Sequence, residues 1–211
     1  MIKNILILSL SIEETESISA KLKENSFVSI NLWHDIGNQV INLNSFDGLI
    51  ITGSDEYLSG NKSYLDIPDN VLTITEEALS MNLPILGIKL GMQVINIALD
   101  GKYPKIITPI NKEGVQKRKD VFISPGSKLT TIIGYAGLMR IGETSSYSIA
   151  VSEKSDVLRA NCYSVDHGFI EGFESDEHNW VLGIRFDPFE PHVPPNFKNL
   201  LESFLSAEKR I

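Results

Sequence analysis

Residues 83–93, Leu-Pro-Ile-Leu-Gly-Ile-Lys-Leu-Gly-Met-Gln, are the most informative segment of this chain. A short apolar run at 85–86 ends at Gly87, and apolar residues at helical spacing follow from 92 to 99. This pattern predicts a strand, a tight turn and a helix. Glycines flank the apex of such a turn because its backbone is strained and because strand and helix pack too closely for a Cβ. The apex residue, at the carboxyl edge of the sheet above a helix N-terminus, is Lys89.

Strand-like and helical patterns alternate through the first half of the chain. Strands are expected at 2–10, 27–32, 47–52 and 85–88, and helices at about 11–25 and 69–82. Such alternation predicts a mostly parallel sheet with helices on both faces and ligands at the carboxyl ends of the strands.

The second half has shorter strand-like runs separated by Gly, Pro and Ser, at 121–124, 138–141, 157–163, 169–173 and 181–186. These runs favour an antiparallel extension of the sheet, and an amphipathic helix at 196–209 is expected to follow it. We expect one domain over residues 1–211.

Composition excludes several classes of function. The net charge is −8 and the longest basic run is Lys117-Arg118-Lys119, read as a solvated turn, so no nucleic-acid partner is expected. The only cysteine, Cys162, excludes an intrachain disulfide and a thiolate-rich metal site, and the four histidines lack ligand spacing. No apolar run reaches the roughly 20 residues of a membrane span. A cytoplasmic protein without metal or cofactor is therefore expected.

Several segments resemble the class I glutamine amidotransferases, most closely the branch of the gamma-glutamyl-gamma-aminobutyrate hydrolases and gamma-glutamyl peptidases. The similar segments, in order, are 47–53, 83–99, 124–129, 168–174 and 183–188. The resemblance covers nearly the whole chain and implies a flavodoxin-like α/β fold. It also implies hydrolysis of a gamma-glutamyl amide by an elbow cysteine with a late histidine and glutamate.

All three catalytic positions of that pattern are substituted in this sequence. The resemblance puts Lys89 at the cysteine, Asp187 at the histidine and Phe189 at the glutamate. Glu190 follows one residue later, but a shift by one residue points a side chain elsewhere, so Glu190 is not counted as a replacement. The paired histidines of the branch would fall near Ser145-Ser146 and are absent.

The ligand-binding part of the pattern is better kept. Gly53 remains in the oxyanion loop, where the next glycine has become Ser54, and Gln93 is retained after the elbow. The resemblance therefore implies a small ligand, a gamma-glutamyl compound or another carboxylate, at Gly53, Ser54, Lys89, Leu90 and Gln93. The acidic pair Asp55-Glu56 is expected to be solvated.

The substitutions change the chemistry of the apex. A lysine with an ordinary pKa of about 10.4 is mostly protonated and is then no nucleophile, and acylation of a neutral amine would give another amide. We predict an ion pair between Lys89 and Asp187, with solvent exposure of Lys89 as the simpler alternative. A lysine that binds anions or forms a Schiff base is a third interpretation, supported by the helix N-terminus beneath it.

The sequence leaves three functions open. The first is a catalytically degenerate amidotransferase-like protein that binds a ligand or a protein, including a second copy of itself. The second is an enzyme, either a weak gamma-glutamyl hydrolase or one that depends on Lys89. The third is a non-catalytic subunit of a synthetase.

Overall fold

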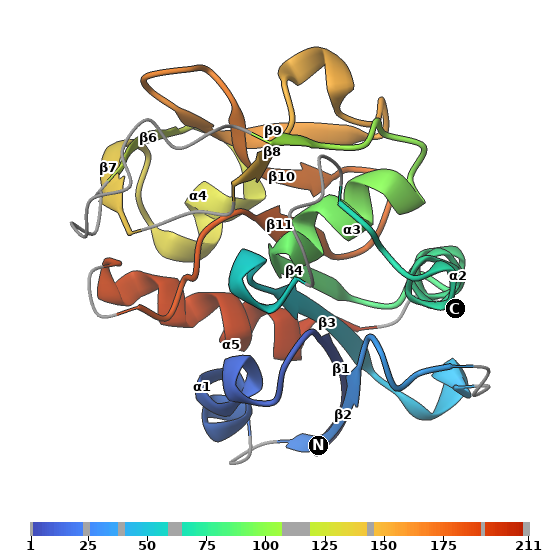
Figure 1. The fold of residues 1–211 in the computed structure, drawn as a ribbon. Helices are drawn as coiled ribbons and strands as arrows, with labels where there is room; N and C mark the ends of the chain where they lie inside the picture. The colour runs from blue at the N-terminus through green and yellow to red at the C-terminus, as the bar shows by residue number, and fades with distance from the viewer. Residues whose placement is uncertain are drawn as a thin grey trace.

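The computed structural model describes residues 2–22, 26–37, 41–58, 65–106, 119–142, 146–190 and 193–208. Within these ranges one large mixed sheet runs through the molecule, with strands in the order β2-β1-β3-β4-β11-β10-β9-β6-β7 (Figure 1). Their bounds, in that order, are Ser26–Leu32, Lys3–Ser9, Gly48–Gly53, Ile85–Lys89, Val181–Ile184, Ile170–Ser175, Leu158–Ser164, Lys119–Ile123 and Gly137–Ile141. The pairs from β2 to β11 are parallel and those from β11 to β7 are antiparallel.

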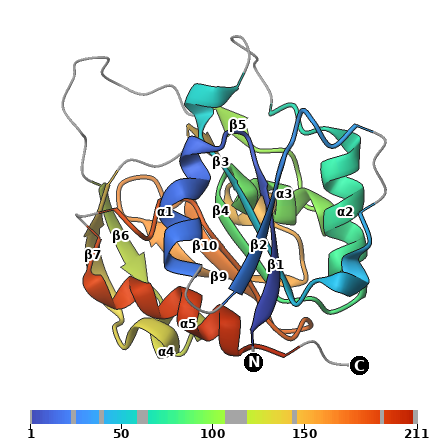
Figure 2. The same cartoon turned by 90° about the horizontal axis from the view of Figure 1, so that it is seen from below.

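Helices cover both faces of this sheet, as Figure 2 shows. The strands alternate strictly, so that Leu6 and Leu8 of β1 pack with α2 (Asp69–Ser80) and α3 (Leu90–Ala98). Ile5 and Ile7 of the same strand pack on the opposite face with α1, α4 and α5. The bounds of these last three helices are Glu13–Leu22, Lys128–Ile133 and Asn199–Ser206. Successive side chains of a buried parallel strand point to opposite faces of the sheet, so each strand contributes to two separate cores.

The predicted architecture, a mostly parallel sheet with an antiparallel extension, is confirmed. The prediction for the segment 181–186 was incomplete, because its strand β11 belongs to the parallel part of the sheet as well as to the antiparallel extension. It pairs in parallel with β4 through Leu182 and Leu86, and antiparallel with β10 through Leu182 and Glu174. This strand therefore joins the two halves of the sheet.

The sequence prediction missed the helix α4. Its last four residues, Thr130 to Ile133, are β-branched and favour a strand. The helix forms instead because its first amides are capped. Ser127 accepts a hydrogen bond from the Thr130 amide at the N-cap. The buried Glu174 carboxylate of β10 accepts two more from the amides of Lys128 and Leu129.

Two smaller features of the structure differ from the prediction. The predicted closing helix at 196–209 is divided into a 3-10 turn, Pro195–Lys198, and α5. A short antiparallel pair, β5 (Lys105–Ile106) with β8 (Tyr147–Ser148), was not predicted. No helix in the described part of the chain is long and apolar enough to cross a bilayer.

Candidate active site at the β4–α3 elbow

The backbone at Lys89 is strained as the sequence pattern predicts. Lys89 is the last residue of β4 and the cap of α3, with φ 54° and ψ −116°. A side chain disfavours this region of backbone space, at a cost of about 1–3 kcal/mol. Such strain persists only where surrounding packing imposes it, and it is common at functional sites.

Two glycines impose this turn by letting α3 approach the sheet. A Cβ built on Gly91 would lie 1.9 Å from the carbonyl oxygen of Ile51 in β3. A Cβ on Gly87 would lie 2.7 Å from the carbonyl oxygen of Gly91. Backbone atoms cannot move aside as a flexible side chain can, so these positions require glycine. They hold the first turn of α3 against β3 and β4.

The side chain of Lys89 is held by two neighbours. Its Nζ donates a hydrogen bond to Ser54 Oγ at 3.0 Å and lies 3.9 Å from Asp187 Oδ2. The predicted ion pair is therefore present, at the long end of the accepted range. The other carboxylate oxygen of Asp187 accepts the amide of Phe189 at 2.8 Å. The lysine and aspartate side chains are 23% and 28% exposed, so a molecule from solvent has access to both.

The structure brings together four of the five positions at which a ligand is expected. Gly53 pairs in register with Lys89, and a Cβ on Gly53 would lie 3.5 Å from Leu90 Cβ. Ser54, which is 8% exposed, completes the group through its bond to Lys89. Asp55 was expected to be solvated, which is wrong, because its carboxylate accepts a hydrogen bond from the Ser146 amide.

Gln93, the fifth position, belongs to a buried polar network that sequence reasoning missed. Its Nε2 donates to the Tyr147 carbonyl at 3.2 Å, and Arg185 Nη1 donates to the same oxygen at 3.3 Å. The Arg185 guanidinium also binds both carboxylate oxygens of Glu171, with an Nε–Oε2 distance of 2.9 Å. Lys119 adds a second cation, 2.8 Å from Glu171 Oε1, so its interpretation as a solvated turn residue is wrong.

A signal for this network exists in the sequence. Glu171 and Arg185 are opposite charges inside apolar strand segments, and such buried charges need a partner. Their pairing joins β10 to the end of β11, so local spacing alone does not reveal it.

The other candidate residues lie apart from the apex contacts. The ring of Phe189 lies beneath Lys21 of α1, with 5.8 Å between Nζ and the ring centroid. A Cβ on Gly142 would lie 2.1 Å from Glu190 Oε2, so that carboxylate packs beside Gly142. Cys162 is fully buried in β9, and burial raises the pKa of its thiol well above the ordinary value. Among the described residues no cluster of metal ligands occurs.

Some residues discussed in the sequence analysis lie outside the described part of the chain. They are Lys117, Arg118, Ser145, His192 and the side chain of Glu56. Of the remaining histidines, His34 and His167 are exposed, and His178 Nδ1 lies 2.8 Å from Ser175 Oγ in the turn between β10 and β11.

Comparison with known proteins identifies the family. The model of the Peptidase C26 family matches residues 16–189, which include the elbow and the segment through Asp187. The chain belongs to the Peptidase C26 family. Its fold is that of the glutamine amidotransferase domains among its structural neighbours.

Three related proteins illustrate the family and the fold. A glutamine-hydrolyzing GMP synthase of Ruthia magnifica subsp. Calyptogena magnifica is 26% identical over 203 residues, 96% of this chain but 36% of the synthase. A Thermoplasma acidophilum protein assigned as a GMP synthase subunit superimposes with a TM-score of 0.68 and 18% identity, over 97% of this chain and 93% of the other. A glutamine amidotransferase of Methylobacillus flagellatus gives 0.69 and 12% identity, over 100% and 97% of the two chains. The chain thus spans little more than a third of that curated synthase.

Proposed function

We propose that this chain is a catalytically degenerate member of the gamma-glutamyl hydrolase branch and acts by binding a small carboxylate at the β4–α3 elbow. One observation carries the proposal: an ammonium group, that of Lys89, occupies the apex of the strained turn beside Ser54 and Asp187. The participation of strands from both halves of the chain in one sheet supports a single domain over 1–211.

Hydrolysis through sulfur lacks its nucleophile and its base. A thiolate attacks an amide only when it reaches the carbonyl and when an imidazole exchanges protons with it. The only cysteine of the chain is buried in β9, and the position assigned to the histidine carries Asp187. Loss of a complete triad costs about 10⁶-fold in rate in a measured protease. Useful amidase activity is therefore not expected.

Lys89 does not replace the thiolate. A protonated amine has no lone pair for attack, and a lysine side chain is ordinarily protonated near neutral pH. Attack by the neutral amine would exchange one amide for another, which resists hydrolysis as much as the substrate does. The enzyme would stop after a single turnover.

The charge at the apex selects the ligand. The Lys89 ammonium has three N–H donors, one of them bound to Ser54 Oγ, and a cationic donor favours an acid over a neutral amide. A carboxylate of the ligand would take the place of Asp187, whose long contact with Lys89 is weak and partly open to solvent. Glutamate, with a carboxylate where glutamine carries an amide, is the simplest ligand of this class.

Titration calorimetry with glutamate and glutamine tests this proposal. We expect glutamate to bind at least tenfold more tightly than glutamine, and Lys89→Met to abolish that preference. Lys102→Met, at an exposed lysine beyond α3, is the matched control and should bind as the wild type does. Equal affinity for the two compounds, or a preference that survives in Lys89→Met, would reject carboxylate binding at the elbow.

A second candidate is a non-catalytic subunit of a synthetase. The observation that favours it is the match of 96% of this chain to a region that makes up 36% of a GMP synthase. Light scattering on mixtures with a separately produced synthetase chain measures this directly. A stable complex of the two chains supports the subunit role, whereas only free chains or self-association of this protein argue against it.

A further inference from the structure

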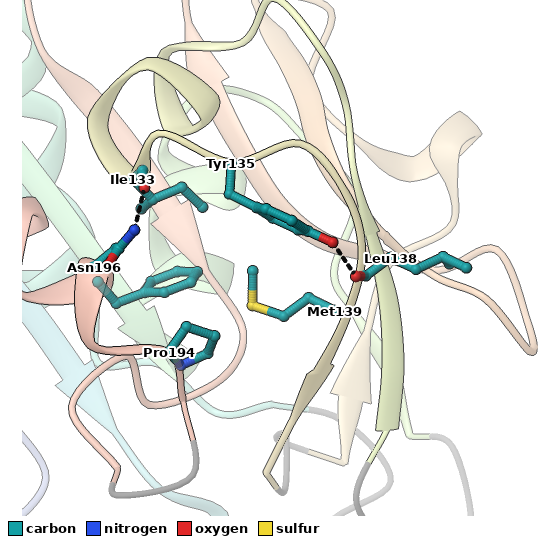
Figure 3. A pocket seen from close by; sticks show the side chains of 7 residues that line it. Ile133, Tyr135, Leu138, Met139, Pro194 and Asn196 are labelled. Carbon is teal, nitrogen blue, oxygen red and sulfur yellow. Dashed lines mark hydrogen bonds between the residues drawn. The ribbon is translucent and has the colours of Figure 1, made fainter.

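A pocket distant in sequence from the elbow is formed at the outer end of the antiparallel extension. Its volume is about 340 Å³, within the range of about 300–1,000 Å³ found for small-molecule sites. It lies between the α4–β7 connection, β7 and the segment before α5 (Figure 3). The lining residues are Ile133, Tyr135, Leu138, Met139, Pro194, Asn196 and Phe197.

The floor of this pocket belongs to the core. Ile133 and Phe197 are each 1% exposed, and the ring of Phe197 packs edge-on against Phe186 with 5.5 Å between centroids. Met139, 8% exposed, points toward the middle of the labelled side chains in Figure 3. Its unbranched thioether can adopt other rotamers to fit a guest.

Two internal hydrogen bonds fix the rim. The Tyr135 hydroxyl donates to the Leu138 carbonyl at 2.6 Å, and Asn196 Nδ2 donates to the Ile133 carbonyl at 3.0 Å (Figure 3). The residue Tyr135 is 44% exposed, yet this bond holds its ring as one wall. The Tyr135 hydroxyl and the Asn196 amide nitrogen therefore form hydrogen bonds within the walls, and the surface toward the interior is mostly apolar.

The chemistry of the lining defines the guest. None of the seven lining residues carries a charge, so nothing there compensates the desolvation of an ionic group. An engineered apolar cavity of about 150 Å³ stays dry and binds benzene. The present pocket is about twice that size. We propose that it is a binding site for a small uncharged apolar molecule, of the size of a two-ring aromatic compound.

The paired strands β7 and β6 supply a matched pair of test positions. Met139 of β7 lines the pocket, whereas Phe122 of β6 is 40% exposed and is not among the lining residues. Phe122 pairs in register with Leu138, so alternation along the strand puts it on the face opposite Met139. Substitution of Met139 changes the interior, and substitution of Phe122 changes the neighbouring surface only.

The probe is N-phenyl-1-naphthylamine, an uncharged two-ring amine whose fluorescence rises in apolar surroundings. We expect saturable binding of one molecule per chain, at least tenfold weaker in Met139→Trp, which fills the pocket, and in Tyr135→Ala, which removes a wall. Phe122→Ala should bind within twofold of the wild type. Tyr135→Ala changes a half-exposed side chain and so tests the site even if the larger substitution disturbs folding.

The opposite results would overturn the proposal. They are the absence of saturable binding to the wild type, binding unchanged in Tyr135→Ala, or a loss in Phe122→Ala as large as that in the pocket variants. Glutamate binding at the elbow is measured separately, so failure at one site leaves the result at the other intact.

Discussion

Two ion pairs lie at the end of β11, and they differ in how firmly they are held. Arg185 forms a bidentate ion pair with Glu171, and both side chains are at most 1% exposed. Two residues later, Asp187 lies 3.9 Å from Lys89, with both side chains about a quarter exposed. The buried pair is part of the fold, whereas the exposed pair can open at small cost. Binding at this edge of the sheet is therefore expected at the second pair.

Breaking the buried pair should have the largest effect. Glu171→Gln leaves the Arg185 guanidinium in the core without its counter-charge, which typically costs about 3–5 kcal/mol. Denaturant unfolding of this variant should show that loss in the free energy of unfolding. Asp187→Asn is the control at the exposed pair, with an expected change below about 1 kcal/mol. Equal losses in the two variants would remove the distinction between the pairs.

The backbone that carries Lys89 should respond next. In Gly87→Ala the added methyl meets the Gly91 carbonyl oxygen at 2.7 Å and Ile95 Cδ1 at 2.6 Å. Overpacking of this kind costs about 1–3 kcal/mol. Thermal unfolding measures the loss, and glutamate affinity should fall with it because the apex shifts. A variant as stable as the wild type would mean that strand and helix are less closely packed than described.

Removal of the lysine charge should change stability little. Lys89→Met breaks a hydrogen bond and a long ion pair that are both partly exposed, so the free energy of unfolding should change by less than about 1 kcal/mol. Denaturant unfolding, carried out beside the Glu171→Gln measurement, gives the comparison. A loss of several kcal/mol would show that this pair also belongs to the core.

The smallest expected effect comes from His178 and is independent of both pairs. Burial lowers the pKa of this imidazole below its ordinary value of 6.5. The folded state then binds fewer protons than the unfolded chain. The contribution to stability is complete above pH about 6.5 and is lost as the pH falls toward the lower folded pKa. Unfolding at a series of pH values should show a shallow decline, absent in His178→Gln; an identical decline in that variant would exclude His178 as its source.

The sequence predicts the elbow because its determinants are local. Gly87 and Gly91 bracket one lysine between an apolar strand and an apolar helix, and the structure has the expected strained turn. The contact of Lys89 with Asp187 was also accessible, because each residue occupies a position in a recognised motif. The sequence does not predict the hydrogen bond from Lys89 to Ser54, although both residues belong to the expected ligand site.

What the sequence did not predict depends on contacts between distant segments. The helix α4 has a β-branched sequence and forms because Glu174, more than forty positions later, caps its first amides. The pocket is similar, since β7 and the segment around Phe197 meet only in the folded chain. The local hydrophobic periodicity of a sequence does not reveal which distant segments come into contact.

Hydrolysis of glutamine, followed as ammonia release, and of an N-substituted gamma-glutamyl amide, followed as release of its amine, shows whether the lysine at the apex leaves any turnover. We expect no release above the buffer rate by the wild type, by Lys89→Ala or by Lys89→Cys, since the last regains a thiol but no imidazole. Sustained release by the wild type that disappears in Lys89→Ala would contradict it.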